Sequence, residues 1–205
     1  MLPVKHAEQA KSRLATPPGM DRARLARAIA LDCLAAARAC PVVDRLVVVT
    51  SDPVVGAAAG RLDELEDDPG TGLLGAVDAG VRRALAGRPA GPLAVLLADV
   101  PALRPDDLAA ALNACRRYEA AFVPDLEGTG TVLLAATASV RLSPAFGPGS
   151  AARHETGGAV RLDLDLPSLR RDVDTWDALG QAIALGVGPA TAAVTRREAW
   201  QGGTT

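Results

Sequence analysis

The chain has 205 residues, of which 49% are hydrophobic and 2% aromatic, and its formal net charge is −2. This length and hydrophobic content suit one domain with a full core, and the slightly acidic balance excludes a general positive field for nucleic acid or an anionic membrane. The scarcity of aromatic side chains also argues against base-stacking recognition of single-stranded nucleic acid.

Cysteine usage and the N-terminal segment predict a cytoplasmic protein. Cys33, Cys40 and Cys115 form no C-x-x-C pair and have no histidine at metal spacing, so we expect reduced thiols in the core. No apolar run approaches the roughly 20 residues of a membrane helix, and no apolar stretch of signal-peptide length follows the start. We therefore expect no membrane partner.

Short apolar runs alternate with helical patterns through the first part of the chain, the order expected of an α/β domain with a mostly parallel sheet. In chain order we predict a short first strand before Lys5, a helix from Asp21 to about Cys40, a strand at 45–51, a short helix at 53–60, a helix at 72–87, a strand at 93–99 and a helix from Asp106 to about Tyr118. The helix at 72–87 should bury a stripe of Leu73, Val77, Val81 and Leu85.

From Ala120 the pattern changes, because short strands follow one another with only one short helix, at 150–155. We interpret this segment as a β-rich insertion beside the main sheet. The alternation in VRLDLDL (160–166) predicts a half-exposed strand, and the last helix should run from Trp176 to about Leu185. Residues 1–188 thus form a single domain, and 189–205, rich in Gly, Pro, Thr and Ala, form a poorly specified C-terminal tail.

The only two lysines, Lys5 and Lys11, lie in the first eleven residues with Arg13 beside them. Ammonium and guanidinium groups both suit phosphate oxygens, so a loop after the first strand would hold three cations for a phosphorylated ligand. The alternative is a solvated, mobile N-terminus.

Two acidic positions are candidates for a metal site. Asp99 follows the apolar run LAVLLA, at the carboxyl edge of a parallel sheet, where a carboxylate can bind Mg²⁺; a turn aspartate that bonds its own backbone is the alternative. In SLRRDVDT, alternation places Asp172 and Asp174 on one face of a strand. Asp174 precedes a helix and suits capping, whereas Asp172 is either a second ligand or a surface partner of an arginine.

Two glycine turns, EGTGT (127–131) and FGPGS (146–150), lie close together in the sequence. Glycine allows backbone to approach a ligand, and hydroxyls of Thr129, Thr131 and Ser150 can donate hydrogen bonds. A helix beginning at Ser150 would add free N–H groups as an anion site. The alternative is two ordinary turns. His154 in the short helix could lie near the ligand, but an exposed position is the stronger expectation.

The known motifs of several enzyme classes are missing. GPGSAA fits G-x-G-x-x-A but does not follow the opening strand of a βαβ unit, and no G-x-x-x-x-G-K-[ST] sequence occurs. No G-x-S-x-G elbow is present either. The sequence context of GPGSAA argues against a dinucleotide-binding Rossmann protein, and the missing motifs exclude a P-loop NTPase and a triad hydrolase.

Six segments in order resemble the guanylyltransferases that make the deazaflavin coenzyme F-420: PVKHAEQAKSRL, DDPGTGLLGA, LLADVPAL, EGTGTVLL, FGPGSAARH and RRDVDT. The resemblance covers roughly Pro3 to Thr175. It implies a Rossmann-like nucleotidyltransferase fold, a three-layer α/β/α sandwich. It also implies an enzyme that joins GMP from GTP to phosphoenolpyruvate, or in archaeal members to 2-phospho-L-lactate, with release of pyrophosphate.

The resemblance implies a role for each matching position. Carried over, these are Lys5, Lys11, Ser12 and Arg13 for the GTP phosphates, Asp68 to Leu74 beside the nucleobase, Asp99 and Asp172 as the catalytic ligands of Mg²⁺, and Thr131, Gly147 and Ser150 for phosphoenolpyruvate. Two positions depart from the family: Leu74 stands where asparagine is common, and Val132 replaces a second threonine.

Two alternatives stay open. The acceptor could be another small phosphate, such as 2-phospho-L-lactate or a molybdopterin. The chain could also be a nucleotide-binding module without catalysis, although a pure binder has less use for two metal carboxylates.

Overall fold

The computed structural model of the chain describes residues 1–9, 20–59, 63–86, 91–138 and 141–201, with the side chains of 197–201 outside the description. The strands are β1 (Leu2–Val4), β2 (Val47–Thr50), β3 (Glu64–Glu66), β4 (Leu93–Leu96), β5 (Ala120–Pro124), β6 (Thr131–Ala136) and β7 (Val160–Arg161). The helices are η1 (Ala7–Gln9, a short 3-10 helix), α1 (Arg22–Ala39), α2 (Pro53–Ala59), α3 (Leu73–Leu85), α4 (Pro105–Cys115), α5 (Ser150–Thr156), α6 (Pro167–Arg170), α7 (Trp176–Leu185) and α8 (Pro189–Gln201).

The strands form one mixed sheet built from two hydrogen-bonded groups, β1-β2-β3 and β4-β6-β5-β7. The groups meet at β1 and β4, where the Met1 amino group donates to Ala94 O at 2.6 Å and Leu96 N–H donates to Met1 O at 3.1 Å. Within each group only the pairs β4–β6 and β5–β6 are antiparallel, so the prediction of a mostly parallel sheet is confirmed. The expected β-rich insertion is wrong, because β5 and β6 extend the main sheet itself.

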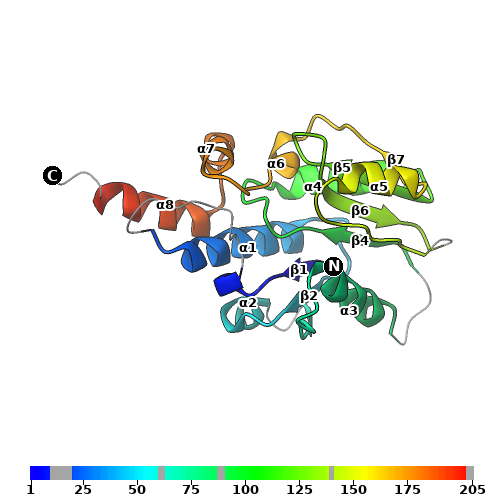
Figure 1. The fold of residues 1–205 in the computed structure, drawn as a ribbon, viewed down its shortest axis with the longest axis horizontal. Coiled ribbons are helices and arrows are strands. Elements are labelled where there is room, and N and C mark those ends of the chain that lie inside the picture. Colours follow the sequence, from blue (N-terminus) through cyan, green and yellow to red (C-terminus); the bar gives the residue numbers. More distant parts are fainter. Residues whose placement is uncertain (10–19, 60–62, 87–90, 139–140, 202–205) are drawn as a thin grey trace.

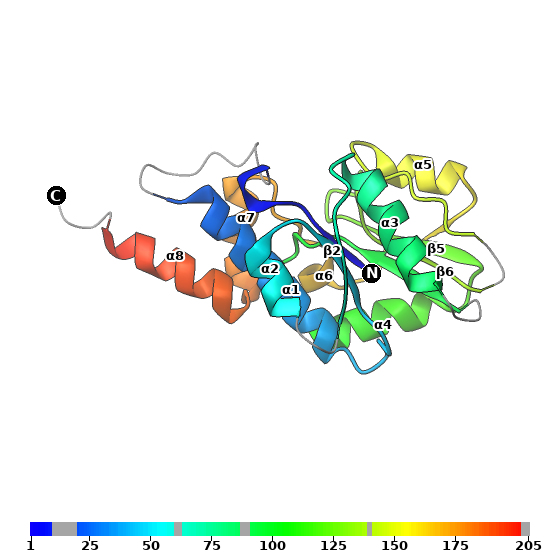
Figure 2. The same cartoon turned by 90° about the horizontal axis from the view of Figure 1, so that it is seen from below.

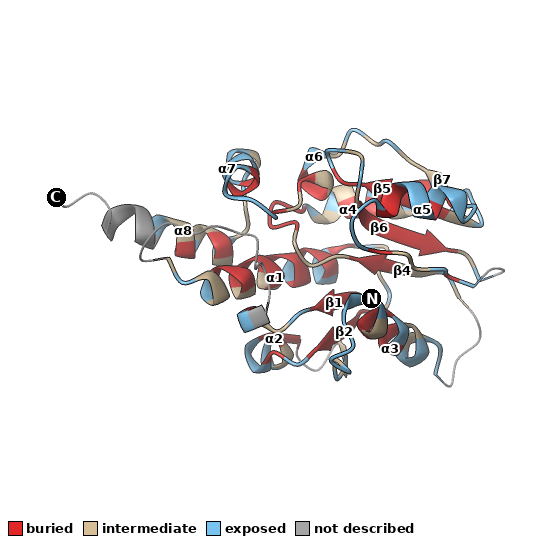
Figure 3. Cartoon of the chain, viewed as in Figure 1, coloured by how far each residue is buried: buried red, intermediate tan, exposed pale blue. Residues whose placement is uncertain are grey.

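Helices cover both faces of the sheet and give three layers (Figures 1 and 2). Successive strand residues point to opposite faces, and in β6 Leu133 packs in the cluster under α1, α2 and α4, while Leu134 packs in the cluster under α3 and α5. Every residue of β6 is buried (Figure 3). The predicted α/β/α sandwich is therefore confirmed.

Helix α3 buries the middle of the predicted stripe together with small residues. Val77 is buried and Val81 packs against the core, as predicted, whereas Leu73 and Leu85 are 36% and 45% exposed. Ala76 and Gly80 are buried beside Val77. A Cβ atom added at Gly80 would lie 2.8 Å from Val49 Cγ2. The close approach of helix and strand therefore selects the small-residue face.

Most of the segment expected to be a poorly specified tail, 189–205, is helical. Its described part, Pro189–Gln201, forms α8, and buried Asp32 of α1 accepts hydrogen bonds from Ala190 N and Thr191 N at 3.0 and 2.8 Å. A third apolar cluster joins α1, α7 and α8 and includes Val173. Figure 1 shows α7 and α8 together at one end of the molecule and α5 with β5, β6 and β7 at the other.

The predicted strand at 160–166 is shorter than its alternation suggests. Only Val160–Arg161 forms β7, and after Leu162 N–H bonds Phe122 O the chain leaves the sheet edge. Pro167 then opens α6. The expected strand through SLRRDVDT is therefore wrong in its first half, since Pro167 at the first helical position favours a helical turn.

Two further expectations concern the core thiols and the membrane. Cys33, Cys40 and Cys115 are buried and form no disulfide, as predicted, and burial raises the pKa of the Cys115 thiol to about 11. Among the described helices, none is both long and apolar enough to cross a bilayer.

Candidate active site

Three aspartates meet where β4 ends. Asp99 follows β4, and Asp172 and Asp174 come from the irregular segment after α6; carboxylate oxygens of the three lie within 4.8 Å of one another. The backbone secures this meeting, because Val173 N–H donates to Asp99 O at 2.9 Å and the Val173 side chain is fully buried. With Val173 pointing inward, its two neighbours share the outward face, as the alternation predicted.

Asp174 belongs to this carboxylate cluster and does not cap α7. The cap is Thr175, whose hydroxyl accepts from Ala178 N at 3.1 Å. The sequence interpretation of Asp174 as a capping residue is therefore wrong. Asp99 and Asp172 are half-buried and Asp174 is exposed, so the cluster lies at the surface with one open side.

Arg170 ties Asp172 to the end of β5. Its guanidinium donates to Pro124 O at 3.2 Å and Asp125 O at 3.0 Å, and its own carbonyl accepts from Leu126 N at 2.9 Å. Such a fork of donors holds two segments at fixed spacing. The Arg170 side chain is thus bonded to the backbone at the end of β5. In a regular strand it would have shared one face with Asp172.

A second group of carboxylates, Asp125, Glu127 and Asp172, also has oxygens within 4.8 Å. Asp125 accepts from Thr129 N at 2.8 Å and Gly130 N at 2.7 Å, and Glu127 pairs with Arg171 at 2.7 Å. These bonds shape the 127–131 turn. Asp172 belongs to both groups, so the two groups of carboxylates adjoin each other.

The two glycine turns lie against each other. Ala151 N–H, in the first turn of α5, donates to Thr129 O at 3.1 Å, and Ser150 N–H donates to Gly147 O at 3.0 Å. These backbone groups are therefore not free for an anion, which corrects the expectation of an open helix N-terminus at Ser150. Gly147, at φ +116°, has a backbone conformation that a side chain would strain.

The structure brings together the three positions predicted to bind the acceptor. Thr131 begins β6, Ser150 begins α5, and both are buried, while Gly147 lies in the exposed loop between them. The turn that precedes Thr131 is built on Asp125, which neighbours Asp172. The paired turns thus adjoin the carboxylate cluster through the Asp125–Asp172 contact.

Lys5 follows β1, the neighbour of β4, so Lys5 and Asp99 leave adjacent strands at the same edge of the sheet. Lys5 is exposed. The other predicted GTP-binding residues, Lys11, Ser12 and Arg13, lie outside the described residues.

Asp52 anchors the segment after Lys5, a role that the sequence reasoning missed. This buried carboxylate accepts from Ala7 N at 3.2 Å, Arg27 Nε at 2.9 Å and two N–H groups that open α2, those of Val54 and Val55. Burial by itself raises the pKa of Asp52, but the bonds from Arg27 and the backbone outweigh it, and the pKa lies below its usual value. The helix-capping pattern Asp52-Pro53 was the available signal.

The turn predicted beside the nucleobase follows β3 at the same edge. Asp68 accepts from Gly70 N at 2.9 Å, and Gly70 and Gly72 have positive φ. Leu74, in the first turn of α3, is 46% exposed.

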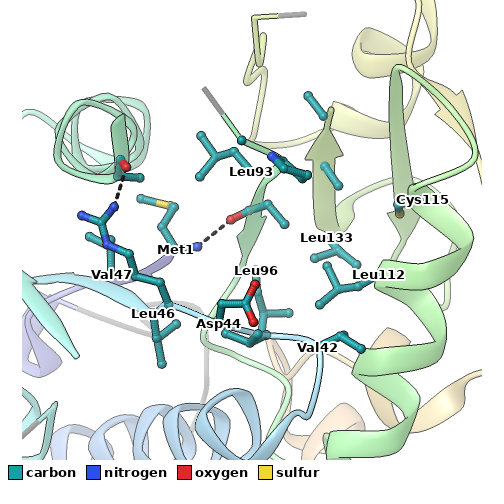
Figure 4. Close-up of a pocket in the computed structure, with 18 of the residues that line it drawn as sticks. Met1, Val42, Asp44, Leu46, Val47, Leu93, Leu96, Leu112, Cys115 and Leu133 are labelled. Atoms are coloured by element: carbon teal, nitrogen blue, oxygen red, sulfur yellow. Dashed lines mark hydrogen bonds between the residues drawn. The ribbon is translucent and has the colours of Figure 1, made fainter. Parts of the chain in front are cut away.

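A separate cavity of about 330 Å³ lies at the opposite, amino edge of the sheet (Figure 4). It begins beside Met1 and is lined largely by apolar side chains such as Leu46, Leu93 and Leu112. Burial lowers the pKa of the Met1 amino group to about 5. The cavity lies at the other end of the strands from Asp99 and is therefore not part of the candidate site.

Comparison with known proteins agrees with this geometry. The family model of a MobA-like NTP transferase domain matches residues 27–163. The phosphoenolpyruvate guanylyltransferase of Streptomyces coelicolor is 47% identical over 201 residues, covering 96% of this chain and 95% of that protein. That of Salinispora arenicola is 48% identical over 197 residues, covering 94% and 90%.

Solved structures support the fold. Rv0371c of Mycobacterium tuberculosis superposes with a TM-score of 0.57 at 20% identity, over 89% of this chain and 96% of that chain. A nucleotidyl transferase of Methanothermobacter gives a TM-score of 0.53 at 18% identity, over 90% and 97%. At these identities the likeness concerns the fold alone.

The sheet order, the two helical layers and the carboxylates at the carboxyl edge define a nucleotidyltransferase of the MobA-like class. Within that class, both guanylyltransferase relatives match nearly the whole chain. The protein belongs to the family of the phosphoenolpyruvate guanylyltransferases.

Proposed function

We propose that the protein transfers GMP from GTP to phosphoenolpyruvate and releases pyrophosphate, as a step in the biosynthesis of coenzyme F-420. The observation that carries the proposal is the meeting of Asp99, Asp172 and Asp174 beside two adjoining glycine turns. Family membership supports the reaction, because the relatives that match nearly the full length are named for it.

The proposed metal is Mg²⁺, with Asp99 and Asp172 as ligands and Asp174 as an added candidate. Three carboxylates whose oxygens lie within 4.8 Å fit a hard divalent cation, which prefers oxygen ligands and few carboxylates. When bound, such a cation would offset the negative charge of the reacting phosphates. A manganese complex of Rv0371c from Mycobacterium tuberculosis, a fold relative, agrees with a divalent site in this class.

The proposed substrate positions follow the edge of the sheet. Lys5, with Lys11, Ser12 and Arg13, would hold the GTP phosphates, since ammonium and guanidinium groups pair with phosphate oxygens. Thr131, Gly147 and Ser150 would hold phosphoenolpyruvate beside the two turns. Both substrates are cytoplasmic metabolites, and the proposal therefore places the reaction in the cytoplasm.

The chemistry requires charge neutralisation more than proton transfer. A phosphate oxygen of phosphoenolpyruvate attacks the α-phosphorus of GTP, the bond from that phosphorus to the bridging oxygen breaks, and pyrophosphate leaves. The attacking oxygen is already anionic, so no general base is needed. The side chains' task is to hold two polyanions in line.

The test is an assay in which each acceptor is supplied in turn. Purified protein with GTP and Mg²⁺ should yield a guanosine diphosphate-linked product with phosphoenolpyruvate, weighed by mass spectrometry, and less or none with 2-phospho-L-lactate. A product with 2-phospho-L-lactate alone would reassign the acceptor.

The same assay tests the carboxylates. Asp99→Asn should lower turnover on the order of 10²-fold or more, as loss of one electrostatic stabiliser does in other enzymes. Near-normal pyrophosphate release by this variant would contradict the role of Asp99. GTP binding without magnesium dependence or turnover, measured by calorimetry, would instead indicate a nucleotide-binding module.

A further inference from the structure

His154 of α5 is buried, 2% exposed, between the two glycine turns. Its Nε2 lies 2.8 Å from Ala145 N, in the loop that leads to Gly147, and its Nδ1 lies 2.9 Å from Thr131 Oγ1. One ring therefore bonds a residue next to each turn. The sequence expectation of an exposed histidine is wrong.

The two bonds determine the tautomer of the ring. A backbone N–H can only donate, so the nitrogen facing Ala145, Nε2, must accept. The neutral ring then carries its proton on Nδ1 and donates it to Thr131 Oγ1. Thr131 keeps its own hydroxyl proton for another acceptor.

The surroundings hold the ring in place and keep it neutral. Phe122 of β5 and Phe146 of the second turn pack on it, with ring centroids 5.7 and 5.2 Å away. Burial, and then the charge of Arg153, lower the pKa of His154 to about 4. The ring is thus uncharged near pH 7.

Arg153 reinforces the second turn from the outside. Its guanidinium donates to Ala145 O at 2.8 Å and to Pro148 O at 2.6 Å. The loop around Gly147 is therefore bonded to α5 on both sides. Only His154, however, also bonds the Thr131 side chain at the start of β6.

We propose that His154 is a positioning residue that sets the spacing of the two turns, and through it the affinity for the phosphorylated acceptor, without contacting the acceptor. This inference rests on the proposed function, which assigns the acceptor to Thr131, Gly147 and Ser150. The ring acts as a neutral double-ended hydrogen-bond bridge. The nucleotide half of the site, at β1 and β4, lies on other elements.

The kinetic test separates the two substrates. His154→Phe removes both hydrogen bonds and keeps an aromatic ring. It should raise KM for phosphoenolpyruvate about tenfold, the loss of affinity expected when one positioning hydrogen bond, or two weak ones, are removed. KM for GTP should stay within about twofold. His154→Asn and His154→Gln, each able to keep one of the two bonds, should fall between, and the exposed neighbour Glu155→Gln should match the wild type.

The outcomes are distinct. An unchanged KM for phosphoenolpyruvate, or an equal rise of both KM values, overturns the positioning role while the proposed function stands. A wild-type protein inactive with phosphoenolpyruvate overturns the proposed function instead.

A spectroscopic measurement tests the hydrogen-bond bridge without an activity assay and without a substitution at His154. The chain has only two histidines, so in a His6→Gln protein the imidazole ¹⁵N signals belong to His154. Between pH 6 and 8 they should show a protonated Nδ1 and an unprotonated Nε2 that do not titrate. Protonation at Nε2, or titration in this range, would overturn the inference.

Discussion

The buried neutral His154 should make the protein lose stability in mild acid, by an amount that follows from its surroundings. Burial, with Arg153 nearby, lowers the pKa from 6.5 to about 4 in the folded protein, whereas the unfolded chain keeps a value near 6.5. The unfolded state therefore binds more protons as the pH falls. The neutral His154 therefore contributes to the free energy of unfolding above pH 6.5, and this contribution is lost progressively down to about pH 4. In full it amounts to on the order of 3 kcal/mol.

Between pH 7 and pH 5 this linkage predicts a loss of about 2 kcal/mol in the free energy of unfolding. Urea denaturation at the two pH values, followed by circular dichroism, measures it in the wild type and in His154→Asn. All other ionisable groups are common to both chains, and their effects cancel in the difference. The wild type should lose about 2 kcal/mol more than the variant, and an identical pH dependence in the two proteins would refute the reasoning.

Two further predictions concern the loop of Lys5 and the last helix. Asp52→Asn weakens the bonds to Ala7 and Arg27, so the free energy of unfolding should fall by about 2 kcal/mol. KM for GTP should rise severalfold while KM for phosphoenolpyruvate does not change, and an unchanged KM for GTP would argue against the anchoring role. Asp32→Ala removes the side chain that caps α8, and a loss of about 1–2 kcal/mol in urea denaturation is expected. Hydrogen exchange should then show faster exchange of the Thr191 amide, and full protection of that amide would contradict this account.

Much of the local structure was predictable because it depends on neighbours in sequence. Asp21 does cap α1, accepting from Ala23 N and Arg24 N, and the helix ends before Cys40 and Pro41 as predicted. The strand before Asp99 could be recognised from its continuous apolar run. The periodicity of side chains and the chemistry of helix caps act within one turn or one strand, so a short window contains the information.

Several errors have one common cause. The stripe predicted for α3 obeys helical periodicity and Val77 in its middle is buried, yet Leu73 and Leu85 at its ends are exposed. The helix instead approaches the sheet through Gly80, which lies against Val49 of a distant strand. The alternation at 160–166 is sound, yet the chain leaves the sheet after two residues of β7. Whether a face is buried depends on what packs on it, and that partner lies far away in sequence.

The candidate site shows the same division. Asp99 and Asp172 were recognisable through position and resemblance, and alternation placed Asp174 on the face of Asp172, but the sequence could not decide between a place in their cluster and a helix cap. The roles of Asp52 and His154 depend on hydrogen bonds to residues 45 and 23 positions away. A single buried aspartate or histidine gives no pattern from which such a bond could be predicted.

The sequence by itself determined the class of fold, most element positions and the kinds of charged residues available at the edge of the sheet. Tertiary structure alone decided which of them meet: the Val173 N–H bond to Asp99 O joins two carboxylates 73 positions apart, and the His154 ring joins two turns. The physical reason is that local preferences act along the chain, whereas the geometry of a site arises from burial and hydrogen bonding between segments that only folding brings together.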